Sequence, residues 1–316
     1  MIPVEVRFER RLAQPRRLSV AVPIASLAVA FLAGAAVLGA TGHDPVATYR
    51  KLVDSAFFAS GAIEQTLIAM TPLLFTGLAA AVAFRIQLFN IGAEGQLLLG
   101  TVGASGIALV LGNSGQAFQI VAMVAAGALF GLLWSLIPAL LRAYAKTNEI
   151  ITSLMLNYVA SLFLTYLIFD SLSYWRDTST PDAQVFPSGK ILPDDSFWPV
   201  IELGSLSVPF GLVLGLVVVT LAWVLYSRTR FGFEARVIGD SPRAARYAGM
   251  RTRRKILAVM GLSGAIAGIG GASQMGDFRH QLDPRGLDQS GYGYAGIVIA
   301  ALARYNPFAV VLVAFL

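Results

Sequence analysis

The stretch ILAVMGLSGAIAGIGGASQMG, residues 256–276, decides the fold class. Its 21 residues include no charged side chain, and the basic run RTRRK at 251–255 comes directly before it. About 20 apolar residues are needed for a helix to cross the hydrocarbon core of a bilayer. Because Lys and Arg collect on the cytoplasmic side of such crossings, the stretch predicts a transmembrane helix that begins at the cytoplasmic face.

Further charge-free runs of similar length occur at 19–40, 67–84, 118–141, 150–169 and 203–226. Of the 316 residues, 56% are hydrophobic and 13% are charged, whereas ordinary globular proteins are roughly 45–50% apolar and about 25% charged. We therefore predict an all-α polytopic membrane protein. The first run exceeds the roughly 7–15 residues of a signal-peptide core, so we expect it to remain as an uncleaved helix.

The distribution of basic residues predicts the orientation. Five Lys or Arg lie in the tail 1–18 and nine lie in the loop 227–255, whereas 170–202 holds six acidic and two basic residues. By the positive-inside rule, the N-terminus and the loop 227–255 face the cytoplasm. The segments 41–61, 170–207 and 277–291 then lie outside, and residues 19–316 form a single transmembrane domain.

Two apolar segments are shorter than a bilayer crossing. They span 97–111 (15 residues, about 22 Å of helix) and 292–303 (12 residues, about 18 Å), against a core of about 30 Å. Polar interruptions adjoin them, NIGAEGQ at 90–96 and RYNP at 304–307. Non-helical backbone at membrane depth must line a cavity or be buried in protein, and paired interruptions are typical of transport folds built on repeats. Irregular helix ends at the interface are the alternative.

We therefore expect about 8–10 transmembrane helices, including broken or re-entrant half-helices, and an internal repeat. The small-residue run 261–272 predicts close helix packing, either within the chain or against another subunit. The last apolar run, from about Phe308, reaches Leu316 without a polar stop. The sequence thus predicts that the C-terminal helix is incomplete.

The cytoplasmic loop contains the signature of a short capped helix. Asp240 and Ser241 offer an N-cap, Pro242 suits the first helical position, and Gly249 suits the C-terminal stop. A helix of two turns is marginal alone and needs a packing surface. That surface is either a cytoplasmic partner subunit or anionic lipid facing Arg243 and Arg246.

Few polar residues come near the apolar runs. Glu94 either bonds free backbone amides or faces a pathway, and Glu64 suits the first turn of a helix. Asn157 lies about 10 Å into its span, so its amide must bond another helix or a solute. Interhelical polar contacts contribute about 0.6–2 kcal/mol. A structural contact between helices and a role in solute translocation therefore both remain open for Asn157. Phe89 and Tyr158 have rings able to stack on a nucleobase.

Several function classes are excluded by what the sequence lacks. There is no cysteine and only two histidines, so neither a metal site nor a thiol nucleophile is expected. The sequence Gly189-Lys190-Ile191 is no phosphate loop, and no other Gly-Lys occurs. The basic residues that give the net charge of +6 flank the spans instead of forming one basic face, so we expect no nucleic-acid partner. We also expect no catalytic residue in this chain.

Four motifs occur in order along the chain: FNIGAEGQL at 89–97; TNEII at 147–151 with LNY at 156–158; GDSPRAARYAG at 239–249; and GYGYAGI at 291–297 with RYNP at 304–307. Together they resemble the permease subunits of bacterial nucleoside and simple-sugar ABC importers, within the branched-chain amino acid and ribose-type permease superfamily. Ala295 departs from the resemblance, because many relatives carry an acidic residue there.

The resemblance implies a permease of the cytoplasmic (inner) membrane that moves nucleosides or simple sugars inward. It implies a second related permease, a cytoplasmic ATPase that holds ATP and Mg, and an extracytoplasmic solute-binding lipoprotein as partners, with lipid around the chain and no cofactor in it. It assigns ATPase coupling to Arg236, Gly239, Asp240, Ser241, Pro242, Arg243, Arg246 and Gly249. The substrate-pathway candidates are Phe89, Asn90, Glu94, Gln96, Asn157, Tyr158 and Asn306.

Two other function classes compete with a permease. An ion-coupled secondary transporter or channel remains the alternative, although the long apolar runs contain no carboxylate or histidine to relay ions. A membrane-embedded enzyme is disfavoured, since no cluster of His, Cys, Asp or Glu occurs within the runs.

Overall fold

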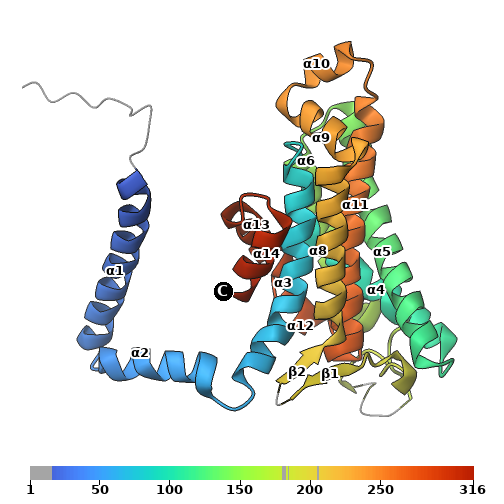
Figure 1. Ribbon diagram of the computed structural model, residues 1–316. Helices are drawn as coiled ribbons and strands as arrows, with labels where there is room; N and C mark the ends of the chain where they lie inside the picture. The colour runs from blue at the N-terminus through green and yellow to red at the C-terminus, as the bar shows by residue number, and fades with distance from the viewer. Residues whose placement is uncertain (1–15, 180–182, 184, 205) are drawn as a thin grey trace, which may run out of the picture. The chain divides into compact units, whose positions relative to one another are not determined.

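The computed structural model describes residues 16–179, 183, 185–204 and 206–316. The chain divides into two units, residues 1–63 and 64–316 (Figure 1). The first unit contains α1 (Arg16–Ala40), α2 (Pro45–Val53) and a π-helical turn η1 (Asp54–Phe58). The Tyr49 hydroxyl donates to the Phe31 carbonyl at 2.8 Å and joins α1 to α2. Most of the predicted cytoplasmic tail, residues 1–15, lies outside the described residues.

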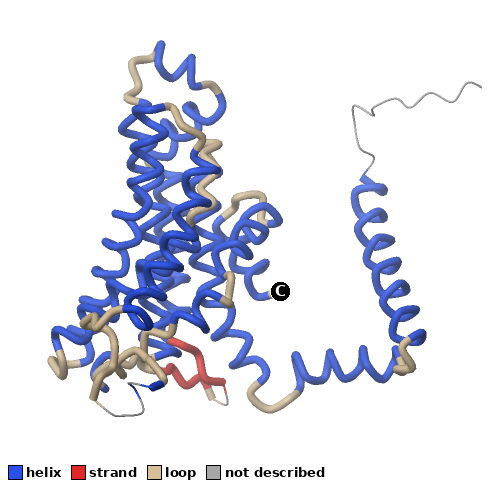
Figure 2. The backbone as a smooth tube through the Cα atoms, turned by 180° about the vertical axis from the view of Figure 1, so that it is seen from behind, coloured by secondary structure: helices blue, strands red, loops and turns tan. Residues whose placement is uncertain are grey.

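The second unit is a helical bundle closed at one end by a short β-hairpin (Figures 1 and 2). Its longer helices are α3 (Ala62–Phe84), α4 (Ala93–Leu111), α5 (Gln116–Leu140), α6 (Glu149–Thr165), α8 (Phe210–Arg228), α9 (Arg230–Asp240), α11 (Thr252–Ser273) and α13 (Tyr292–Leu302). Shorter elements are α10 (Pro242–Tyr247), α12 (Pro284–Asp288), α14 (Pro307–Phe315), the turns η2 (Leu141–Ala145), η3 (Tyr166–Asp170), η4 (Asp194–Ser196) and η5 (Gln274–Arg279), and the antiparallel strands β1 (Val200–Leu203) and β2 (Leu206–Pro209).

The prediction of an all-α polytopic membrane protein is confirmed. Among the described residues, six helices are long and apolar enough to cross a membrane: Ala62–Phe84, Ala93–Leu111, Gln116–Ala145, Glu149–Asp170, Phe210–Arg228 and Thr252–Arg279. Helix α1 carries a further apolar segment, Ile24–Ala40. We call the end of the bundle with α9 and α10 the basic end, and the end with β1 and β2 the acidic end (Figure 1).

Glycines bring α4, α5 and α11 into backbone contact. A Cβ on Gly268 of α11 would overlap the backbone of Gly127 in α5, and a Cβ on Gly100 of α4 would overlap the backbone of Gly268. Small residues allow helices in a membrane to approach this closely. The small-residue run 261–272 therefore packs inside the chain, which is one of the two arrangements expected.

The expectation of a half-span at 97–111 is wrong. Helix α4 begins at Ala93 and has 19 residues, because Glu94 and Gln96 continue it into the polar motif. Both side chains are buried, and hydrogen bonds within the protein make them tolerable at that depth. The second expected half-span is confirmed, since α13 has only 11 residues.

The segment between η5 and α13 re-enters the bundle instead of staying outside as expected. It starts at the acidic end, where the Leu192 amide donates to the His280 carbonyl at 2.8 Å. The Ser161 hydroxyl then donates to Asp288 at 2.6 Å, and Ser161 lies about 18 Å along α6 from its first residue. The chain reaches the basic end where the Arg85 guanidinium donates to the Tyr305 carbonyl. Helices α12 and α13 thus form one interrupted crossing.

Candidate translocation face and coupling segment

Asn90 and Gln96 form a buried amide pair at the start of α4. The Asn90 Nδ2 donates to the Gln96 Oε1 at 3.0 Å, and the Gln96 Nε2 donates to the Asn90 Oδ1 at 3.1 Å. Asn90 also donates to the Ser263 hydroxyl at 2.9 Å, and Ser263 donates to the Ala79 carbonyl at 2.7 Å. The pair therefore links α4 to α11 and α3, and its polar groups are directed at protein groups.

Asn157 of α6 binds the first turn of α4 and the chain just before it. Its Oδ1 accepts from the Gly95 amide and its Nδ2 donates to the Ile91 carbonyl, both at 2.9 Å. Only 2% of Asn157 is exposed. The polar motif 90–96 is thus buried in protein, as non-helical backbone at membrane depth requires. A direct contact of Asn90, Gln96 or Asn157 with solute stays a prediction.

Glu94 joins α4 to the short helix α13. One carboxylate oxygen accepts from the Gly293 amide in the first turn of α13, where a negative charge is favoured by the helix dipole. The other oxygen, Oε1, is buried and has no hydrogen-bond partner among the described residues. A Cβ on Gly293 would overlap the Glu94 backbone. Glycine at that position lets the two helix starts touch.

Next to Glu94, an exposed polar face runs along α6, α12 and α13. We call it the translocation face and define it by Tyr158, Ser161, Asp288 and Tyr294. Tyr158 is 58% exposed and Tyr294 is 39% exposed, and Asp288 is exposed as well. Tyr294 has Asn157, Glu94, Tyr158 and Asp288 as electrostatic neighbours. An ionisable group facing lipid at the bilayer centre costs about 2.5–3.5 kcal/mol or more, so this face fits a water-filled pathway or a subunit contact.

The sequence predicted Tyr158 and Glu94 but missed the other members of this region. Asp288 belongs to a polar stretch that is typical of an external loop, and only its contact with Ser161 places it at depth. Ser161 is a single small polar residue within an apolar run. Tyr294 lies inside the GYGYAGI motif, so that motif was the available signal.

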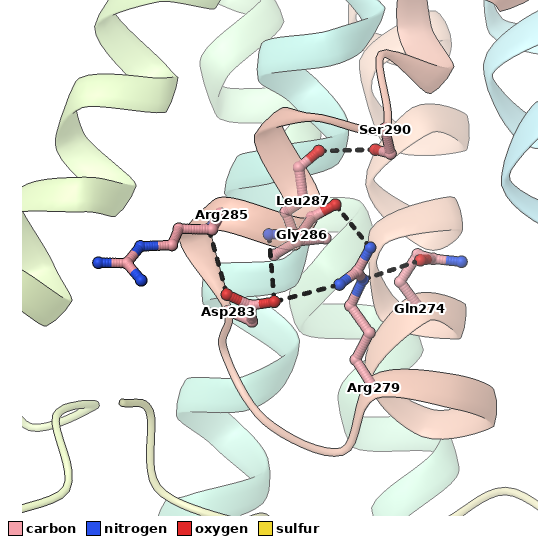
Figure 3. Close-up of polar contacts among 7 residues, drawn as sticks. All are labelled: Gln274, Arg279, Asp283, Arg285, Gly286, Leu287 and Ser290. Carbon is pink, nitrogen blue, oxygen red and sulfur yellow. Dashed lines mark hydrogen bonds and ion pairs between the residues drawn. The ribbon is translucent and has the colours of Figure 1, made fainter. Parts of the chain in front are cut away.

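Polar contacts around Arg279 hold the re-entrant segment in place (Figure 3). Its guanidinium donates to the Gly286 carbonyl at 2.7 Å and contacts Asp283 and Gln274. Asp283 accepts from the Gly286 and Arg285 amides and caps α12. The Arg285 side chain points away from this cluster in Figure 3 and lies 4.9 Å from the centre of the Phe169 ring. Helix α12 is therefore tied to both η5 and η3.

The other two pathway candidates lie near the basic end. Phe89 is 41% exposed and packs on Phe84 with ring centroids 5.2 Å apart. Asn306 caps α14, because its Oδ1 accepts from the Phe308 amide at 3.1 Å. Phe84 also contacts the ring of Tyr305. The structure thus divides the predicted pathway residues into a buried network, the translocation face and this aromatic cluster.

The predicted capped helix is present as α10. The Ser241 hydroxyl accepts from the Ala244 amide at 3.3 Å, Pro242 is the first helical residue, and Gly249 has a φ of +74°. Ala245 is fully buried, whereas Tyr247 is 99% exposed. Helix α10 therefore packs inward through Ala245 and presents Tyr247 outward.

Helix α9, which no sequence pattern indicated, joins α10 to the bundle. Asp240 is its last residue, and Arg236 is exposed on it. Gly239 lies against the backbone of Ile86, because a Cβ on Gly239 would stand only 3.0 Å from the Ile86 Cα. Glu234 pairs with Lys255 of α11 at 2.6 Å. The hydrogen bond from Lys255 and its charge lower the pKa of the Glu234 carboxyl.

A cavity of about 450 Å³ opens beside α10. It is lined by Arg230, Phe233, Glu234 and residues 248–251. Phe233 is 61% exposed. Together with Tyr247, this cavity places aromatic side chains next to arginines at the basic end. Both residue types are enriched at the centres of protein interfaces.

Comparison with known proteins decides the family. Residues 62–316 match the family model of the branched-chain amino acid transport system permease component. The chain belongs to this permease family. It is 30% identical to a nucleoside ABC transporter permease of Lactococcus lactis, over 94% of this chain and 81% of that protein. It is 31% identical to a guanosine ABC transporter permease of Bacillus subtilis (93% and 82%) and 32% identical to a glucose ABC transporter permease of Haloferax volcanii (98% and 81%).

The first two of these organisms also have a second, more distant permease relative with the same named substrate. In Lactococcus lactis it is 25% identical over 79% of this chain and 77% of the relative, and in Bacillus subtilis it is 27% identical over 78% and 76%. No solved structure shows a significant match to the chain. The permease family and the helical bundle together describe a multi-pass membrane protein.

Proposed function

We propose that the chain is the permease subunit of an ABC importer that moves nucleosides or simple sugars inward across the cytoplasmic membrane. The observation that carries the proposal is the translocation face, where a carboxylate, a hydroxyl and two phenols lie at the surface beside the interrupted crossing α12–α13. The names of the similar permeases support nucleosides or sugars as the solute class.

The chemistry of the translocation face suits an uncharged polyol. Asp288 already accepts a hydroxyl hydrogen bond from Ser161, so a ribose or hexose hydroxyl is a suitable replacement donor. Tyr158 and Tyr294 present rings able to stack on a base or on the apolar face of a sugar. Glu94 is an electrostatic neighbour of Tyr294, and its Oε1, which has no hydrogen-bond partner among the described residues, is a further acceptor.

A second permease is the partner we propose at the translocation face. Exposed Asp288 is costly against lipid, and a second subunit would cover the face and close a pathway between the two chains. The occurrence of two related permeases with one named substrate in both Lactococcus lactis and Bacillus subtilis supports this pairing.

The cytoplasmic ATPase is the partner we propose at the basic end. ATP and Mg would be bound by that ATPase. Tyr247 and the cavity beside α10 would receive it. The solute-binding lipoprotein would dock at the opposite, acidic end, and the N-terminus would lie in the cytoplasm with the basic end. In the predicted external loop, Ile191 pairs with Gln281 and the Leu192 amide donates to the His280 carbonyl, so this part of the loop lies at the acidic end, as the arrangement requires.

The contacts suggest how ATP-driven movement reaches the pathway. Movement of α10 passes to α9, and Gly239 of α9 rests on Ile86, just after α3. Helix α3 contacts α13, because the Thr76 hydroxyl donates to the Tyr292 carbonyl at 2.9 Å. A displacement of α9 would therefore shift α3 and the start of α13, where the Glu94–Gly293 contact lies.

Ion-coupled transport is the alternative to test, because Asp288 and Glu94 lie at membrane depth, where carboxylates can relay ions. The test is uptake of labelled guanosine and ribose into proteoliposomes containing the chain with its ATPase, second permease and binding protein. We expect accumulation with ATP at the ATPase side that a protonophore does not abolish. Accumulation driven by a proton or sodium gradient without ATP would overturn the proposal.

A further inference from the structure

A small cavity at the basic end is separate from the translocation face. It has a volume of about 230 Å³ and is lined by Arg85, Tyr226, Gly232 and Arg236. Arg85 follows α3 directly, Tyr226 belongs to α8, and the other two belong to α9. A Cβ on Gly232 would overlap the Tyr226 backbone. This close approach brings α9 onto the ends of α3 and α8 and forms the cavity wall.

Among the described residues, the two arginines of the cavity have no acidic partner. Arg85 and Arg236 are electrostatic neighbours, and in the described part of the chain neither contacts a carboxylate, since the ion pairs found there involve other cations. The Tyr226 hydroxyl donates to the Val82 carbonyl at 3.1 Å and is not an anion either. Two like charges that share a cavity repel each other, and a bound anion would relieve that repulsion.

Arg85 is anchored at one side of the cavity. Its Nε donates to the Tyr305 carbonyl at 3.1 Å, and its guanidinium carbon lies 5.5 Å from the centre of the Tyr226 ring. Arg85 is half-buried while Arg236 is exposed. One anchored and one exposed guanidinium, with their planar donor groups, suit the tetrahedral oxygens of a phosphate.

We propose that this cavity binds a phosphate group between Arg85 and Arg236. Its volume is below the roughly 300–1,000 Å³ of pockets that enclose whole drug-sized molecules, so a single phosphate or a lipid head group fits better than a nucleotide. Basic pockets between transmembrane helices on the cytoplasmic side bind anionic lipid head groups. The bound phosphate bridges the end of α3 and helix α9. This inference does not depend on which solute the chain transports.

The test is phospholipid binding by the purified full-length protein, measured by native mass spectrometry with phosphatidylglycerol and, separately, phosphatidylcholine. Arg236→Gln should weaken phosphatidylglycerol binding about tenfold, the factor that 1.4 kcal/mol represents, and leave phosphatidylcholine binding unchanged. Arg228→Gln is the matched control, because it removes the same charge from an exposed position at the same end, over Trp223 and outside the cavity.

A second arm distinguishes a lipid from a free phosphate. Inorganic phosphate is titrated against chloride at equal ionic strength, and the thermal unfolding midpoint is followed. A phosphate-dependent rise in wild type that is lost in Arg236→Gln, without lipid discrimination, assigns the cavity to free phosphate. If neither ligand distinguishes wild type from Arg236→Gln, or if Arg228→Gln loses as much binding, the proposal is overturned. Arg236 makes no described hydrogen bond, so Arg236→Gln should fold, whereas Arg85→Gln also loses the contact with Tyr305.

Discussion

At the scale of single residues, two carboxylates reach membrane depth by different routes. Glu94 is visible in the sequence because it stands beside an apolar run, whereas its contact with the start of α13 depends on how the two helices pack. Asp288 is not visible, because local sequence describes it as part of a polar loop. Only the contact with Ser161, 127 residues away in the chain, brings it to the middle of α6.

Replacing Asp288 tests the translocation face. Asp288→Asn keeps the shape of the side chain but removes its charge and one acceptor. We expect uptake at low solute concentration to fall about tenfold, since hydrogen bonds to charged groups contribute about 1.5–3 kcal/mol. The fall is measured as uptake of labelled nucleoside or sugar into cells that contain matched amounts of inserted protein. Asp170→Asn is the control, because Asp170 is exposed at the end of η3 and lies outside the face. Unchanged uptake in Asp288→Asn would contradict the assignment.

The Glu234–Lys255 pair makes the attachment of α9 dependent on pH. The pKa of Glu234 is lower in the folded protein than in the unfolded chain, so its contribution is present above the unfolded value and is lost as pH falls through the folded value. We expect amide hydrogen exchange in α9, corrected for its intrinsic pH dependence, to accelerate over that acidic window. Glu234→Gln should exchange faster at neutral pH and show little further change on acidification. Equal protection in wild type and Glu234→Gln at neutral pH would count against the role of this pair.

At the scale of elements, composition predicted the crossings and local chemistry predicted α10. Long charge-free runs need only length and hydropathy to identify them, and the cap of α10 is set by neighbouring residues such as Ser241 and Pro242. Three features escaped prediction for a common reason. The start of α4 at Ala93, the re-entry of α12, and helix α9 all depend on contacts between residues distant in sequence, with polar groups satisfied by other helices.

The packing of α4, α5 and α11 gives a test with a control on the same helix. Gly268→Ala places a methyl group against the Gly127 backbone, and we expect it to destabilise the fold by about 1–3 kcal/mol, as overpacking does. Gly261→Ala meets only side-chain atoms at 3.6 Å or more, so it should be close to neutral. Thermal unfolding of the two purified variants in detergent compares them. Equal unfolding midpoints would show that this backbone contact is not tight.

At the scale of the whole molecule, a continuous line of contacts leads from the basic end of the bundle to the start of α13. Tyr247 is at one extreme and the Glu94–Gly293 contact is at the other. Between them lie α9, the chain after α3 and the Thr76–Tyr292 hydrogen bond. In the proposed coupling, Tyr247 would receive the movement and the interrupted crossing α12–α13 would respond to it.

The most direct test of ATP-driven coupling is ATP-dependent uptake by the complete reconstituted complex carrying Tyr247→Ala. Tyr247 is 99% exposed, so the fold should not change, whereas a buried aromatic anchor at an interface typically contributes about 2 kcal/mol or more to binding. We predict at least about tenfold lower uptake at limiting ATPase subunit. The control Tyr166→Ala, at an exposed position of η3 and away from the basic end, should transport normally. Full ATP-driven uptake by Tyr247→Ala would contradict the proposed coupling through α10.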